Sequence, residues 1–218
     1  MPNSFIKESN KFILAIHSTK NYFGFGYKPT TGNKIDEKIF IKKFDRDLSN
    51  HLPTDLYKFI SDKSFRSVER ITVSTGPANF NASRLIITLA RTLSQQLNCS
   101  LDGFSSFQIM GKRIAIKNNI NDLNKPFWII NQLKKRGFIS GKYCLASNKI
   151  SPDKIFIKEL IRPKIFEEIP TKELYFEAEY DVQEDLRELL SLSFENYCNS
   201  ITNKWDKVLP IYPLSAIN

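Results

Sequence analysis

Apolar and polar positions follow distinct patterns along the first 115 residues, and each pattern predicts an element. The unbroken apolar run KFILAIHST at 11–19 predicts a buried strand. The alternating segment YFGFGYK at 22–28 predicts a second strand, and KIFIKKF at 38–44 predicts a third after the turn TTGN at 30–33. Three strands joined by short turns indicate an antiparallel meander.

Two later stretches place apolar residues at helical spacing. Residues 48–62 carry Leu48, Leu52, Leu56, Phe59 and Ile60 on one face, and residues 85–97 carry Ile86, Leu89, Leu93 and Leu97 on another. Strands are predicted at 69–75 and 100–106, and a third helix begins near residue 107. The order is therefore β-β-β-α-β-α-β-α, which implies a mixed sheet with helices on its faces. By analogy, this order occurs in the ribonuclease-H-like half of actin-type folds.

The second half of the chain contains a weak echo of the first. FILAIHSTKNYFGFGY at 12–27 resembles FWIINQLKKRGFISGKY at 127–143, and one inserted residue places His17 opposite Asn131. A duplicated half-fold leaves such a trace, although two unrelated hairpins also match in this way by chance. A strand is predicted at 154–161, and a surface loop in the acidic segment 167–181. A closing helix carries Leu186, Leu189, Leu190, Phe194 and Tyr197 on one face.

The net charge of +9 is distributed unevenly. Residues 1–166 contain 28 Lys and Arg against 12 Asp and Glu, a balance of +16, whereas residues 167–188 contain 2 basic and 9 acidic residues, a balance of −7. The basic part is consistent with RNA or an acidic protein as a partner. A general bias of composition toward lysine on solvated faces gives the same balance.

Cysteine and histidine usage and hydropathy limit the class of protein. Cys99, Cys144 and Cys198 lie far apart, which indicates reduced thiols. With His17 and His51 as its two histidines, the chain is a poor source of ligands for zinc. No apolar run approaches the ~20 residues that span a bilayer. We therefore expect a cytoplasmic protein with no metal site and no membrane contact.

The stretch STGPANFNASR at 74–84 raises the question of phosphate binding. A Gly-Pro turn between a strand and a helix is a common place for it, because backbone N–H groups and the helix dipole converge there. A phosphate cradle normally uses several glycines, and this loop has Gly76 alone. Its asparagines, Asn79 among them, are good N-caps instead. Arg84 is suited either to pairing with an anion or to covering the sheet edge.

Two further groups are weak candidates for chemistry. His17 follows the first strand, but the next acid in sequence is Asp36, and the chain has no G-x-S-x-G nucleophile turn. The cluster KKRG at 134–137 is suited to nonspecific phosphate contact. It is equally typical of a solvated turn, since no aromatic side chains are interleaved with the charges.

Several segments together resemble the TsaB (YeaZ) family, the smaller glycoprotease-like relative in the tRNA threonylcarbamoyladenosine system. ILAIHST at 13–19 resembles the family's opening ILAIDTST, and STGPANFNASR resembles its GPGSFTGLR turn. LSNHLPTDLYKFI at 48–60, GFSSF at 103–107 and PIYPL at 210–214 resemble a Leu-Pro helix, a G-V-S-S-L segment and a closing P-x-Y-L. The resemblance runs nearly end to end and is strongest over 12–110.

The sequence departs from that family at several points. The strand-end Asp of the family is His17 here, two glycines of the turn are lost, and the Arg that often ends the tail is Ser215. Two strand-end carboxylates hold the metal-nucleotide in actin-like ATPases. The corresponding places would be His17 and Asn131, and neither replaces a carboxylate for Mg²⁺. The stretch 74–84 is therefore interpreted as a vestigial nucleotide-fold loop, with Gly76, Asn79 and Arg84 as its remnants.

The resemblance implies an actin-like (ASKHA) duplicated fold with a complete first lobe at 1–110. A reduced second lobe at 111–218 would be closed by the C-terminal helix. It also implies a non-catalytic scaffold without a cofactor of its own, paired with the paralogue TsaD and the ATPase TsaE. Those partners would handle ATP and threonylcarbamoyl-AMP, and tRNA would be reached through the complex. The sequence leaves open whether the chain alone forms a homodimer.

In this family the pairing uses the two helices of the first lobe. Carried over, the interface residues are Leu48, Leu52, Leu56, Phe59, Ile86, Leu89 and Leu93. Two alternatives stay open from the sequence. One is an RNA-binding module that uses the basic segment, and the other is a diverged ATP-dependent enzyme, a sugar-kinase-like phosphotransferase or a peptidase.

Overall fold

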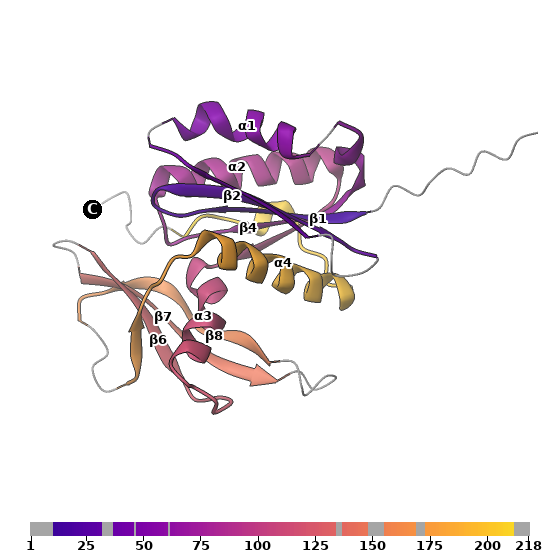
Figure 1. Cartoon of the computed structure of the whole chain (residues 1–218). Coiled ribbons are helices and arrows are strands. Elements are labelled where there is room, and N and C mark those ends of the chain that lie inside the picture. Colours follow the sequence, from indigo (N-terminus) through magenta and orange to yellow (C-terminus); the bar gives the residue numbers. More distant parts are fainter. Residues whose placement is uncertain are drawn as a thin grey trace, which may run out of the picture.

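The computed structural model describes residues 11–31, 37–45, 47–60, 62–133, 137–147, 155–168 and 173–211. Residues 32 and 33 of the TTGN turn, the basic cluster at 134–136 and the chain beyond residue 211, with Ser215 and most of the PIYPL motif, lie outside these ranges. Two mixed sheets form the framework of the molecule (Figure 1). Among the described residues, no helix is both long and apolar enough to cross a membrane.

The first sheet has the strand order β3-β2-β1-β4-β5. Its strands are β1 (Phe12–Ser18), β2 (Tyr22–Pro29), β3 (Lys38–Lys43), β4 (Val68–Ser74) and β5 (Ser100–Phe104). The predicted meander is confirmed, because β2 pairs antiparallel with both β1 and β3. β4 pairs parallel with β1 and with β5, and a 3₁₀ turn (Asp62–Ser67) precedes it.

Helices cover both faces of this sheet, as the alternation of elements predicted. Helices α1 (Leu48–Phe59) and α2 (Phe80–Leu97) lie on one face, where Leu14 and Ile16 of β1 join their core (Figure 1). Helix α4 (Val182–Cys198) lies on the other face, against Ile13 and Ala15. Successive side chains of β1 thus enter two different cores, which explains why its sequence is apolar throughout.

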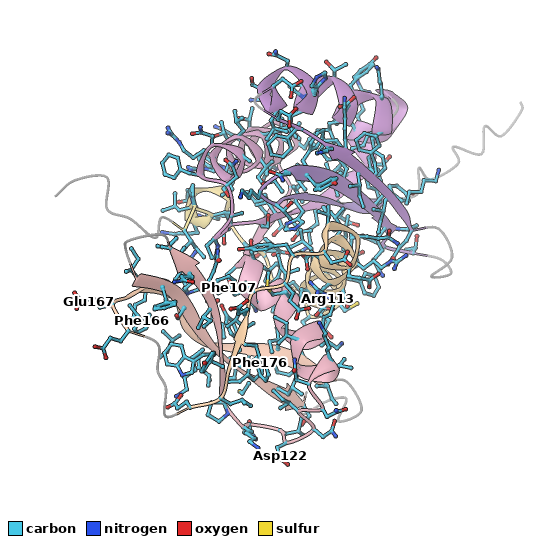
Figure 2. The ribbon with its side chains drawn as sticks, turned by 60° about the vertical axis from the view of Figure 1, so that its left-hand side comes forward. Phe107, Arg113, Asp122, Phe166, Glu167 and Phe176 are labelled. Carbon is cyan, nitrogen blue, oxygen red and sulfur yellow. The ribbon has the colours of Figure 1, made fainter. Side chains whose placement is uncertain are left out.

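The second sheet has the order β8-β7-β6-β9. Its strands are β6 (Phe127–Leu133), β7 (Gly137–Ser147), β8 (Ile155–Phe166) and β9 (Tyr175–Glu177). Helix α3 (Ser106–Lys117) covers one face of this sheet, and Phe107 of the helix and Phe176 of β9 belong to the core between them (Figure 2). Phe166 lies away from this core (Figure 2), beside Trp128. The acidic segment expected to be a loop contributes β9, a three-residue strand parallel to β6.

The two sheets repeat one topology. β1 lies between an antiparallel β2 and a parallel β4, and β6 lies between an antiparallel β7 and a parallel β9. The predicted duplication is confirmed, and the second lobe is the reduced one. Within the described residues, its sheet has no counterpart of β5.

The last helix belongs to the first lobe, in contrast to the expectation that it closes the second. α4 packs on β1, β2 and β4. Gly24 and Gly26 of β2 make this possible, because a Cβ on them would lie 2.8 Å from Leu186 Cδ1 and 2.9 Å from Leu190 Cδ1. The expected lobe boundary at residue 110 falls inside α3, which contacts both α4 and the second sheet.

A buried ionic cluster fastens α4 and the C-terminal segment to the first sheet. Asp102 on β5 accepts two hydrogen bonds from Arg70 Nη1 on β4, at 2.9 and 2.8 Å. It also accepts from Ser193 Oγ on α4 at 2.6 Å and from Asn203 Nδ2 at 2.7 Å. A short 3₁₀ turn (Trp205–Lys207) follows. Because the Asp102 carboxylate has hydrogen-bond partners on several elements, it fixes the position of α4 on the first sheet.

Candidate functional site

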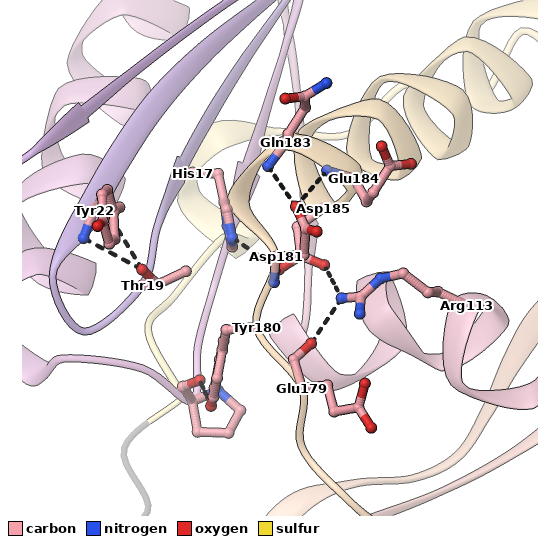
Figure 3. A network of polar contacts seen from close by, with 11 residues as sticks. His17, Thr19, Tyr22, Arg113, Glu179, Tyr180, Asp181, Gln183, Glu184 and Asp185 are labelled. Carbon is pink, nitrogen blue, oxygen red and sulfur yellow. Dashed lines mark hydrogen bonds and ion pairs between the residues drawn. The ribbon is translucent and has the colours of Figure 1, made fainter. Parts of the chain in front are cut away.

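The carboxyl ends of β1, β4 and β6 meet between the two lobes, where open α/β folds bind ligands. His17, near the end of β1, is completely buried, and its Nε2 lies 3.4 Å from Asp185 Oδ2 on α4 (Figure 3). Arg113 on α3 donates to Asp185 Oδ1 at 2.8 Å and to the Glu179 carbonyl at 2.7 Å. The position of the expected strand-end carboxylate thus holds an imidazole, and an acid approaches it from another helix.

Tyr180 spans the space between the lobes. Its hydroxyl donates to the Pro77 carbonyl at 2.9 Å, in the loop after β4 (Figure 3). The Asn131 side chain near the end of β6 forms a hydrogen bond with the same hydroxyl. Burial raises the pKa of Tyr180, and the charge of Asp185 raises it further, so the hydroxyl keeps its proton. Asn131, one of the two positions matched to metal-binding carboxylates, is therefore engaged within the chain. The buried ring nitrogens of His17, the other position, have no hydrogen-bond partner among the described residues, although Nε2 lies beside the Asp185 carboxylate.

The loop after β4 is held by backbone and capping contacts. Gly76 has φ of +91°, a conformation that favours glycine, and its carbonyl accepts from the Ser106 N–H at 2.7 Å. The Asn79 side chain accepts from the N–H groups of residues 81 and 82, at 3.1 and 3.2 Å. Asn79 is therefore the N-cap of α2, as predicted. Arg84 lies over the Phe80 ring, with its guanidinium carbon 5.5 Å from the ring centroid.

A second polar cluster lies at the start of α3. Ser105, the N-cap of α3, donates to Glu159 Oε2 on β8 at 2.7 Å and lies 3.1 Å from the Tyr143 hydroxyl on β7. Tyr143 donates to the same Glu159 oxygen at 3.2 Å. Burial, together with the Glu159 charge, raises the pKa of Tyr143. These contacts join α3 to the second sheet through Ser105, one of the two serines of the GFSSF motif.

The predicted interface residues divide into two groups. Leu48, Leu52, Leu56 and Ile86 are buried against the first sheet, so a partner cannot reach them. Phe59, Leu89 and Leu93 are half-buried and pack on the same core. The helical stripes therefore serve the chain's own core. The exposed apolar residues of α1 and α2 are instead Tyr57, Phe80 and Leu85.

Three acidic residues of the C-terminal part form ion pairs with basic residues of the first part. Glu173 pairs with Lys142 at 2.8 Å, Glu179 with Lys117 at 2.7 Å, and Asp185 with Arg113 at 2.8 Å. The Glu173 pKa is lowered by its hydrogen bonds from Lys142 and Trp128. These pairs join the −7 segment to three basic side chains of the +16 segment, and the chain as a whole keeps a net charge of +9.

Sequence reasoning missed Arg113, Tyr180 and Asp185. Tyr180 lies in the acidic segment 167–181, whose composition suggested solvated charge, and Asp185 lies in the first turn of α4. Arg113 lies in a helix of unremarkable pattern. A burial signal was nevertheless present, since Asp185 directly precedes Leu186 on the apolar stripe of α4. Among the described residues, no group of three or more His, Cys, Asp or Glu is arranged to hold a metal ion.

The comparisons with known proteins identify the fold. No protein-family model matches the sequence, and no curated protein matches it. A structure described as an uncharacterized protein with similarity to peptidase YeaZ from Pseudomonas aeruginosa superposes with a TM-score of 0.67 and 12% identity, covering 94% of this chain and 100% of that chain. YeaZ from Pseudomonas aeruginosa gives 0.64 and 13%, covering 93% and 100%. The chain therefore has a YeaZ-like fold.

Proposed function

We propose that this chain is a non-catalytic scaffold of TsaB type, which pairs with a TsaD-type paralogue and a TsaE-type ATPase. That complex makes threonylcarbamoyladenosine next to the tRNA anticodon. ATP, threonylcarbamoyl-AMP and tRNA are bound by the partners, and this chain supplies the surface on which the paralogue docks.

The observation that carries the proposal is the likeness of fold to YeaZ, which covers 93% of this chain and 100% of the YeaZ chain. The interlobe contacts support the non-catalytic part of it. The Asn131 position is engaged by Tyr180, the His17 ring lies beside the Asp185 carboxylate, and the carbonyls of Gly76 and Pro77 accept hydrogen bonds from within the chain. A nucleotide in the manner of actin-like ATPases would have to displace these contacts.

The docking surface is proposed to be the outer side of α1 and α2. Because the predicted leucine stripes are buried, the partner would meet the exposed residues of these helices, with Leu85 of α2 among them. An interface core should be apolar and poor in charge. Leu85 is 36% exposed, and a charge placed there would face the partner without entering the core.

The test is the variant Leu85→Asp. We expect its affinity for the purified TsaD-type paralogue to fall at least about tenfold, as for a residue at the centre of an interface. Leu160→Asp on β8 is the matched control, because Leu160 is 43% exposed and lies in the other lobe. Both variants should keep the far-UV circular dichroism of the parent chain. Equal affinity of Leu85→Asp and the parent in a binding titration would reject this interface.

A further inference from the structure

A groove with a volume of about 760 Å³ lies between α3 and α4. α3 contributes Ile109, Lys112 and Ile116, and α4 contributes Glu184 and Glu188, so that each helix presents residues at the spacing of one helical face. Arg113, labelled in Figures 2 and 3, also lines it. The volume is within the range of small-molecule sites, roughly 300–1,000 Å³.

Most charges of this groove are satisfied by neighbours. Lys28 pairs with Glu37, Lys117 with Glu179 and Arg187 with Glu184. Lys112 and Glu188 differ from them. Both are half-buried, and within the described ranges neither forms a hydrogen bond or an ion pair.

The charges of Lys112 and Glu188 influence each other, although the two side chains form no hydrogen bond or ion pair within the described ranges. Burial raises the pKa of Glu188, while the charge of Lys112 lowers it and those of Glu195 and Asp185 raise it. A half-buried carboxylate and ammonium that face one cavity without contact leave part of their desolvation uncompensated. A ligand with one charge of each sign would compensate both.

We propose that this groove binds a small zwitterion, a molecule with a carboxylate and an ammonium group on an apolar body. Lys112 holds the carboxylate and Glu188 holds the ammonium group. The apolar body lies along Ile116, which is 63% exposed at the groove. Free amino acids and short peptides share this chemistry, and the experiment distinguishes them.

The probes are L-leucine and the dipeptide leucyl-leucine, titrated calorimetrically into the whole chain at neutral pH. N-acetyl-leucine lacks the ammonium group and leucinamide lacks the carboxylate, so they are the matched controls. Binding of leucine assigns the site to amino acids, and binding of the dipeptide alone assigns it to short peptides. We expect removal of either charge to weaken binding about tenfold or more, the effect of losing one charge-assisted hydrogen bond.

The variants Lys112→Met and Glu188→Gln should each weaken binding to the same extent. Lys125→Met is the control, because Lys125 is exposed and does not line the groove. All three should unfold cooperatively, so that loss of binding is not loss of fold. The proposal is overturned if neither zwitterion binds at millimolar concentration, if the singly charged analogues bind equally well, or if the groove variants bind like the parent.

Discussion

Replacing Asp102 with alanine removes the acceptor at which β4, β5, α4 and the C-terminal segment meet. The carboxylate is 1% exposed and Arg70 is 4% exposed. Removing one partner of a buried ion pair costs about 3–5 kcal/mol, because the other charge stays buried without compensation. For a chain of this length, 1 kcal/mol lowers Tm by about 2–4 °C, so we expect Tm to fall by roughly 6–20 °C.

The assay is urea unfolding followed by circular dichroism, in which the midpoint should move and the slope should not. Asp122→Ala is the control, because this side chain is 77% exposed and should change stability by less than about 0.5 kcal/mol. The double variant Arg70→Met with Asp102→Leu should recover part of the loss, since neither charge is then left alone. A loss below about 1 kcal/mol for Asp102→Ala would refute the reasoning.

Three other predictions concern single groups. Glu188→Gln should raise Tm at pH 7, because a carboxylate whose pKa is raised on folding destabilises the folded state when ionised. The gain in Tm should disappear as the pH falls below about 4.5. A gain in Tm that stays constant with pH would contradict this cause. Iodoacetamide at pH 8 should modify the exposed Cys198 and spare Cys99, whose thiol pKa is raised by burial to about 11, with peptide mass spectrometry as the readout. Tyr180→Phe should cost about 1–3 kcal/mol in urea unfolding, because the Pro77 carbonyl loses its donor, and an unchanged midpoint would show that this bridge is not stabilising.

The sequence was sufficient to predict the hairpin that begins each lobe and the order of the main elements, but not β9, whose parallel pairing with β6 completes the repeated topology. Runs and alternation of apolar residues identify the strands. The match between residues 12–27 and 127–143 aligns His17 with Asn131, and both residues lie near the ends of equivalent strands. The N-cap Asn79 was also predictable, because an asparagine before a helix has a local function. In each case the determining interactions lie within a short stretch of chain.

The remaining features depend on contacts between distant segments. Periodicity showed that α4 has an apolar face but not which sheet it covers. Gly24 and Gly26 were a signal, since glycine within a strand often marks the close approach of another element. A helical stripe such as Leu48–Leu56 does not distinguish a core from an interface. The pairing of His17 with Asp185 has no local signature at all.

The most direct test of the account is capture of the tagged chain from the cells that make it, with mass spectrometry of the proteins and RNA recovered. The account predicts a larger glycoprotease-like paralogue of TsaD type together with a small P-loop ATPase. Recovery of RNA and ribosomal proteins without the paralogue would contradict it, and so would recovery of the chain alone.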